Sequence, residues 1–114
     1  MGIVKQSDAS SLLAPIRSAI HKLGTDLRDA RLRRRIPTIV MAQRASISRT
    51  TLNKAEKGDP NVSMGTYASL LFITGLLPRF ADLADVKHDQ LGLQLDEERL
   101  PKRIHLPKDR KIKS

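Results

Sequence analysis

The chain has 114 residues, which is enough for one domain with a modest core. Its 21 Lys and Arg residues outnumber its 12 Asp and Glu residues, so the net charge is +9 and an anionic partner is expected: nucleic acid, an anionic membrane or an acidic protein. The absence of cysteine excludes disulfides and thiolate metal sites, and the scarcity of aromatic residues favours helices over a β sandwich.

The first nine residues are polar and without pattern, and a flexible N-terminal arm is expected there. The N-terminus lacks the apolar stretch of a signal peptide, and no run of the chain approaches the roughly 18 apolar residues of a membrane span. The sequence therefore predicts a cytoplasmic protein with no membrane partner.

A first helix is predicted from Pro15, which suits the first turn of a helix. Apolar residues then recur at spacings of three and four and share one face: Ile16, Ile20, Leu23, Leu27 and Ala30. Gly24 costs about 1 kcal/mol relative to Ala, so a bend or a division of the helix is expected there. The helix must end before Pro37, which cannot continue it.

Two short helices are predicted next. Residues 38–45 have room for about two turns, and the following helix begins after Ser48, its natural N-cap, and is closed by a left-handed Gly58. Two helices that cross closely need a small residue in the first helix, here Ala42, and apolar residues around it. These are Met41, Ala45, Ile47, Leu52 and Ala55. The pattern is typical of a helix-turn-helix unit.

A fourth helix, capped by Ser63, is predicted along MGTYASLLFITGLL, residues 64–77. Its broad apolar face is expected to comprise Met64, Tyr67, Leu70, Leu71 and Ile73. A fifth short helix is predicted roughly from Pro78 to Ala84, carrying Phe80 and Leu83.

The charge changes sign twice after the fifth helix. Residues 82–98 hold six acidic side chains against Lys87 alone, and the last fourteen residues are strongly basic. A tail of this charge density should not pack a core. Three parts are thus expected: the arm over residues 1–9, a domain over 10–87, and a partly disordered extension with a basic tail over 88–114.

The stretch MAQRASISRTTLNKAEKG, within residues 23–76, resembles the phage-repressor-like helix-turn-helix family, often called the Xre family. The resemblance implies an all-α domain of five helices, which binds double-stranded DNA as a homodimer on a palindromic operator and places its third helix in the major groove. It also implies an internal salt bridge between Arg31 and Glu56, which makes Glu56 structural rather than catalytic.

Three residues depart from the family pattern. Ser46 stands where the family usually has Gly in the turn, so a left-handed conformation costs more there. Pro37 replaces the usual Ser or Thr cap of the second helix, and Thr38 replaces the usual Gln that contacts a phosphate. Thr38 could take over the cap or the phosphate contact.

The residues expected at DNA follow from helix geometry, because Leu52 and Ala55 point inward. The outer face of the third helix should read bases, led by Arg49, which can bond O6 and N7 of guanine, and including Thr50, Asn53 and Lys54. Phosphate contacts are expected from Thr38, Gln43, Ser48, Thr51, Lys57, Asn61 and Ser63.

These assignments have simpler alternatives. An exposed Arg49 or Gln43 can be an ordinary solvated side chain, and the arginines at 33–35 can meet either phosphates or an acidic partner. His21, His88 and His105 are scattered without further ligands, so no metal site is predicted. No Ser, His and Asp group and no phosphate-binding Gly loop is recognisable, so neither an enzyme nor a cofactor is expected.

A narrower resemblance comes from DQLGLQLDEERLPKRI, residues 89–104, together with VSMGTYASLLFITGLL. These segments look like the antitoxins encoded beside HipA-type kinase toxins, the HipB-like branch of the family. This resemblance implies a dimeric autorepressor that also binds a HipA-like kinase toxin.

Two other functions stay open. One is a stand-alone or phage-type regulator without a toxin, and the other is a protein-binding adaptor that uses the helix-turn-helix only as a scaffold. The basic residues on the first and third helices favour DNA binding over the adaptor. The dimer interface is expected at Leu76, Leu77 and Phe80, extended by residues 91–95.

Overall fold

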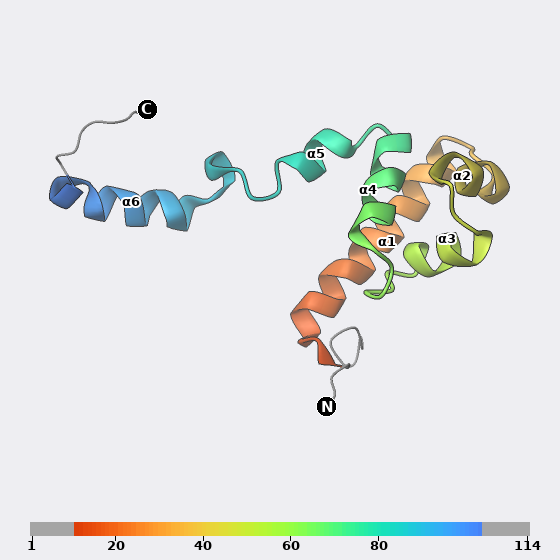
Figure 1. Cartoon of the computed structure of the whole chain (residues 1–114), viewed down its shortest axis with the longest axis horizontal. Helices are drawn as coiled ribbons and strands as arrows, with labels where there is room; N and C mark the ends of the chain where they lie inside the picture. Colours follow the sequence, from red (N-terminus) through yellow and green to blue (C-terminus); the bar gives the residue numbers. More distant parts are fainter. Residues whose placement is uncertain (1–10, 104–114) are drawn as a thin grey trace. The chain divides into compact units, whose positions relative to one another are not determined.

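The computed structural model describes residues 11–103, and these residues form six α-helices and no strand (Figure 1). The all-α prediction is confirmed for this part of the chain. The helices are α1 (Ala14–Arg33), α2 (Thr38–Ala45), α3 (Arg49–Glu56), α4 (Met64–Ile73), α5 (Leu77–Ala81) and α6 (Gln90–Arg103), with a short 3₁₀ helix η3 (Val86–His88) before α6.

The chain divides into two compact units, of which the first ends at Phe80 and the second begins at Ala81. This division comes earlier than the boundary expected after residue 87. The predicted N-terminal arm and all of the basic tail after Arg103 lie outside the described residues.

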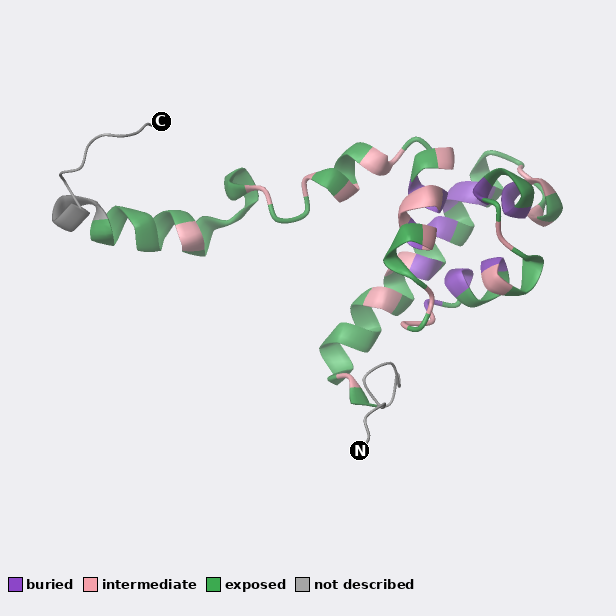
Figure 2. Cartoon of the chain, viewed as in Figure 1, coloured by how far each residue is buried: buried purple, intermediate pink, exposed green. Residues whose placement is uncertain are grey.

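The core of the first unit lies where α1, α2, α3 and α4 meet, and the buried positions gather there in Figure 2. Each of these four helices contributes one large side chain that is fully buried: Leu27, Met41, Leu52 and Leu70. Burial of such a side chain contributes about 1.5–3 kcal/mol. The residues expected to hold α2 against α3 are buried as predicted, except that Ile47 is only partly buried against the same core.

Four helices of the first unit end in the same way. Each is followed by a residue with positive φ: Arg35 at 55°, Ser46 at 57°, Gly58 at 73° and Gly75 at 79°. The next N–H then reaches back to a carbonyl in the last turn, as in the 3.0 Å bonds from Ile47 to Ala42 and from Asp59 to Lys54. The left-handed Gly58 is confirmed, whereas Arg35 was not foreseen, because Pro37 alone was expected to stop α1.

Gly24 does not divide α1, so the expected division is wrong. The helix is continuous from Ala14 to Arg33, and Gly24 is buried where α1 crosses the end of α3. A Cβ at Gly24 would lie 2.5 Å from the carbonyl oxygen of Ala55 and 2.7 Å from Cα of Gly58. The glycine is therefore needed for the close approach of two backbones.

The predicted N-caps of α3 and α4 are confirmed. Ser48 Oγ accepts the N–H of Thr51 at 3.0 Å, and Ser63 Oγ accepts the N–H of Thr66 at 3.0 Å. These bonds satisfy one of the free N–H groups at the start of each helix. The entry of α3 and α4 into the fold is thus set by local sequence.

The fourth helix is shorter than predicted and ends at Ile73 rather than near residue 77. Thr74 Oγ1 bonds the carbonyl of Leu70 at 3.0 Å, and Gly75 turns the chain, so α5 starts at Leu77 and stops at Ala81 instead of near residue 84. Met64 was placed on the apolar face but is 73% exposed, because it lies in the first turn beyond the core.

The second unit contains a helix that was not predicted, α6. Asp89 Oδ1 accepts the N–H of Gly92 at 3.0 Å, so an acidic residue caps this helix. The cap at Asp89, followed by Leu91 and Leu95 at a spacing of four, was a local signal for a helix that the acidic composition obscured. No side chain between residues 81 and 99 is buried, so the described part of this unit has no core of its own.

Candidate nucleic-acid interface

The segment from α2 to α3 is a pair of short helices joined by a turn of three residues. Ser46 turns the chain in the left-handed conformation, Ile47 packs partly against the core, and Ser48 caps α3. Leu52 and Ala55 are completely buried on the inner side of α3. This anchoring fixes which side of α3 faces solvent.

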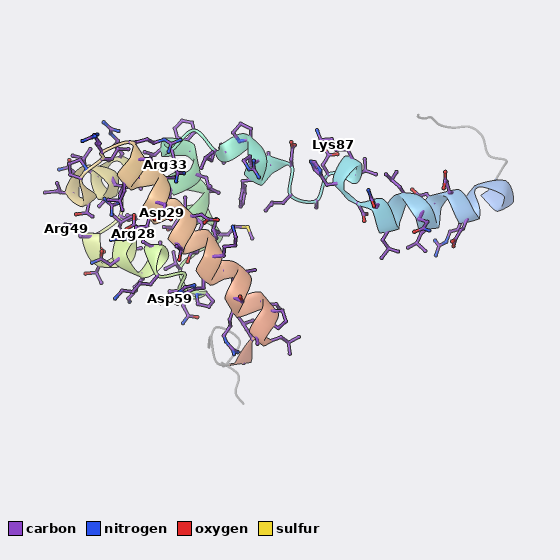
Figure 3. The ribbon with its side chains drawn as sticks, turned by 180° about the vertical axis from the view of Figure 1, so that it is seen from behind. Arg28, Asp29, Arg33, Arg49, Asp59 and Lys87 are labelled. Carbon is purple, nitrogen blue, oxygen red and sulfur yellow. The ribbon has the colours of Figure 1, made fainter. Side chains whose placement is uncertain are left out.

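The four residues expected to read bases all lie on the solvent side of α3. Arg49 and Thr50 occupy its first turn, and Asn53 and Lys54 follow one turn later, all of them exposed. Figure 3 shows Arg49 at the start of the helix. Within residues 11–99, no hydrogen bond or ion pair engages these four side chains. They are therefore available to a ligand.

The residues expected at phosphates differ in their exposure and in the hydrogen bonds that they already make. Gln43 and Lys57 are exposed, whereas Thr38 is half-buried. The hydroxyls of Ser48 and Ser63 cap helices and also donate to the Oγ1 atoms of Thr51 and Thr66 at 3.0 Å, so their hydrogen-bonding capacity is largely used within the protein. The structure therefore gives these two serines a structural role first.

Asn61 lies beside an acidic residue. Its N–H bonds Asp59 Oδ1 at 2.8 Å, and the Asp59 carbonyl accepts the hydroxyl of Tyr67 at 2.8 Å. Burial, assisted by the Asp59 carboxylate, raises the pKa of Tyr67 to about 12. A carboxylate so close to Asn61 opposes a phosphate at this position.

The N-terminus of α2 has no side-chain cap. Pro37 occupies the N-cap position and Thr38 is already the first helical residue, so Thr38 does not take over the capping role. The N–H groups of the first turn have no partner inside the helix, and such groups attract anions. The phosphate contact of Thr38 stays a prediction.

The structure brings Arg31 and Glu56 together in a buried ion pair between α1 and α3. Arg31 Nε bonds Glu56 Oε2 at 2.7 Å and Nη2 bonds Oε1 at 3.1 Å, and the two side chains are only 7% and 6% exposed. Arg31 Nη1 also bonds the carbonyl of Ile36 at 2.9 Å. One guanidinium thus connects α1, the loop before α2 and the end of α3, which holds α3 in its orientation.

Positive charge dominates the described part of the first unit. Residues 11–80 contain twelve Lys and Arg residues and four acidic residues. The three arginines at the end of α1 are exposed, and Arg34 bonds the carbonyl of Ala30 at 2.8 Å. Arg44 is also exposed on α2, and no spacing in the sequence singled it out because its importance depends on the neighbouring α4.

Other kinds of site find no support in the described residues. No three His, Cys, Asp or Glu side chains between residues 11 and 103 are placed to hold a metal ion together. None of the helices in the same range has the length and apolar character required to cross a bilayer. Comparisons of the chain with protein-family models, with curated proteins and with solved structures found no match.

Proposed function

We propose that this protein is a sequence-specific DNA-binding transcriptional repressor of the helix-turn-helix type, similar to the Xre family, that acts in the cytoplasm without a cofactor. In this proposal α2 and α3 form the motif, and α3 enters the major groove of double-stranded DNA. The observation that carries the proposal is the outer face of α3, whose four polar and cationic side chains have no partner among the described residues.

The dimensions of α3 suit this role. A helix of eight residues is about 12 Å long, which is comparable with the width of the major groove. Arg49, in the first turn, can donate two hydrogen bonds from its guanidinium group to O6 and N7 of a guanine, and the Asn53 amide can pair with adenine. Thr50 and Lys54 each follow one of these two residues along α3 and can contact neighbouring base edges.

The phosphate backbone would be held by the surroundings of α3. The uncapped start of α2, with Thr38 at its first position, suits one phosphate, and the exposed Gln43 and Lys57 suit others. The excess of positive charge in the first unit would make the affinity strongly dependent on salt.

A homodimer on a palindromic operator completes the proposal. A single eight-residue recognition helix buries too little surface for specific binding, whereas two helices about one DNA turn apart reach two half-sites. Leu76 and Phe80, expected at the interface, are already partly packed on the core of their own unit, while Leu91, Leu93 and Leu95 are exposed.

Selection of a binding site from random DNA, followed by titration of variants, tests this function. Arg49→Ala should weaken binding to the selected operator about ten- to a hundredfold and relax specificity at one base position. Lys57→Ala should weaken all sequences alike and lower the salt slope by about one. Arg17→Ala, an exposed cation near the start of α1, is the matched control. Normal operator binding by Arg49→Ala would refute the assignment of α3.

The narrower proposal is that the repressor is the antitoxin of a HipA-type kinase toxin and represses their shared operon. Its support is the resemblance of residues 62–77 and 89–104 to the HipB-like branch. A kinase-like reading frame beside the gene, whose product copurifies with the full chain and loses toxicity in its presence, is the expected result. An operon without such a frame would leave a stand-alone regulator.

A further inference from the structure

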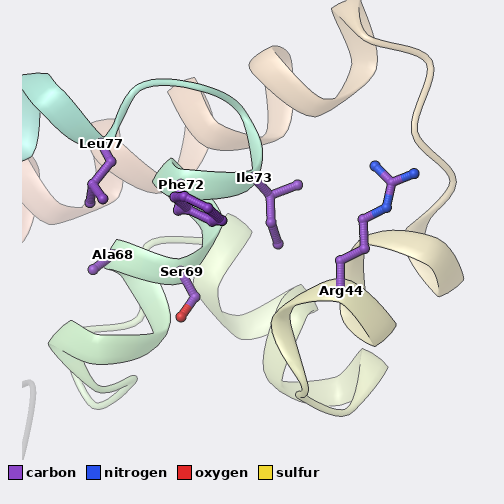
Figure 4. A pocket seen from close by; sticks show the side chains of 6 residues that line it. All are labelled: Arg44, Ala68, Ser69, Phe72, Ile73 and Leu77. Carbon is purple, nitrogen blue, oxygen red and sulfur yellow. The ribbon is translucent and has the colours of Figure 1, made fainter.

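An open groove lies along α4 in the first unit (Figure 4). It has a volume of about 650 Å³ and is bounded by α2 on one side and α5 on the other. Its lining is mainly apolar, and Figure 4 shows Leu77 at one end, Phe72 and Ile73 in the middle and the guanidinium of Arg44 at the other end. Phe72 is 69% exposed, so the groove presents an apolar surface to solvent.

Helix α6 in the second unit has the opposite property, because nothing in its own unit buries any of its side chains between residues 90 and 99. Leu91 is 66% exposed, and Leu93 and Leu95 are each 44% exposed. An isolated helix of about 12–15 residues is marginal in water, and α6 has 14 residues. A stable α6 therefore requires a partner that covers at least one of its apolar faces, such as the face of Leu91 and Leu95.

We propose that α6 from a second copy of this chain docks in the groove along α4. Leu91, Leu95 and Glu98 follow one another at spacings of four and three and so share one face of α6. The two leucines match the apolar lining, and the carboxylate one turn further on matches Arg44 at the end of the groove. The inference names an interface for the homodimer of the proposed function and rests on it in that respect alone.

Charge selects the second unit as the occupant of the groove. The described part of the first unit is strongly basic, so contact between two first units is opposed by repulsion. Residues 81–99 hold six acidic residues against Lys87 and Arg99, so they are attracted to that basic surface.

A reciprocal exchange between two copies also meets the size that a dimer needs. Stable interfaces bury roughly 1,200–2,000 Å² in total, which one short helix does not reach alone. Two α6 contacts related by a twofold axis double the buried area and close the assembly as a dimer.

Mixing two single-cysteine variants of the full chain tests the geometry, because the chain contains no cysteine. Arg44→Cys mixed with Glu98→Cys should give a mixed disulfide dimer under mild oxidation. Leu93→Cys, whose side chain lies on the opposite face of α6, should not link to Arg44→Cys. Docking within one chain would instead give no mixed dimer, together with an internal disulfide in the double variant, and would overturn the proposal.

Sedimentation of variants tests the energetics. Leu91→Glu combined with Leu95→Glu should raise the dimer dissociation constant roughly a hundredfold, whereas Leu93→Glu should leave it unchanged. Arg44→Glu and Glu98→Arg should each weaken the dimer about tenfold, and their combination should restore it. These positions are exposed, so the variants should keep the circular dichroism of the parent. A dimer unaffected by the leucine pair would overturn the proposal.

Failure here and failure of the proposed function are separable. If the dimer depended on α6 but bound no DNA, the proposed repressor function would be refuted and the proposed interface would stand. If the protein bound its operator through Arg49 but dimerised without α6, the interface would be refuted and the repressor function would stand.

Discussion

Glu56→Ala should destabilise the first unit by about 3–5 kcal/mol, because it leaves the guanidinium of Arg31 buried without its counter-charge. In the folded chain that guanidinium makes two bonds to the Glu56 carboxylate, at 2.7 and 3.1 Å, and one to the carbonyl of Ile36. Only the bond to Ile36 survives the substitution. The cost is a large part of the roughly 5–15 kcal/mol that stabilises a typical domain.

A second variant separates the charge from the packing. Arg31→Met combined with Glu56→Leu removes both charges and fills similar space, so it should cost less than Glu56→Ala alone. It still leaves the Ile36 carbonyl without its donor, which costs about 1–3 kcal/mol. The double variant should therefore fall between the parent and Glu56→Ala.

Urea unfolding followed by far-ultraviolet circular dichroism measures these differences. The matched control is Asp26→Ala, which breaks the exposed pair of Lys22 and Asp26 on α1, 2.7 Å apart, and should cost at most about 0.5 kcal/mol. If Glu56→Ala cost no more than Asp26→Ala, the ion pair would not be what holds α3 to α1.

Three further predictions concern the backbone and one buried hydroxyl. Ser46→Gly should stabilise the fold by about 0.5–1 kcal/mol in urea unfolding, because Ser46 holds a φ of 57° that glycine adopts without strain; a loss of stability would contradict this. Gly24→Ala should cost about 1–3 kcal/mol, since the new Cβ meets the Ala55 carbonyl, whereas Gly65→Ala should stabilise, because its site is exposed and helical and the new Cβ would make only an ordinary contact, 3.8 Å from Ser63 Oγ; equal effects would refute the close packing. Stability should fall as the pH rises above 10, because folded Tyr67 keeps its proton to about pH 12 while the unfolded chain releases it near 10; Tyr67→Phe should lose this part of the pH dependence, and an unchanged profile would contradict it.

Much of the first unit could be predicted from local signals. Ser48 and Ser63 are N-caps that predict the starts of α3 and α4, and Gly58 predicts the end of α3. The spacing of Leu52 and Ala55 defines the inner side of α3. The candidate base-reading face follows directly, because the residues between the buried positions must point to solvent.

The wrong predictions have two causes: a tertiary contact at Gly24, and local signals that the general composition obscured at Thr74 and Asp89. Gly24 is unfavourable in an isolated helix, but here the backbone of α3 approaches too closely for any Cβ. Thr74 was read as part of a longer apolar helix, yet its hydroxyl bonds the last turn of α4 and ends it. The acidic composition after Ala81 hid α6, whose cap at Asp89 is a local signal.

The sequence by itself determined the helical class, the order of the first four helices and the basic character of the chain, because these depend on periodicity, caps and composition. Tertiary structure alone decided that Gly24 serves a backbone contact, that Arg31 also holds the Ile36 carbonyl, and that Arg44 borders an apolar groove. The contact at Gly24 and the groove beside Arg44 join residues distant in the chain, so they depend on how the helices pack rather than on any spacing within one helix. The bond from Arg31 to Ile36 depends on the turn after α1, where Arg35 has a positive φ.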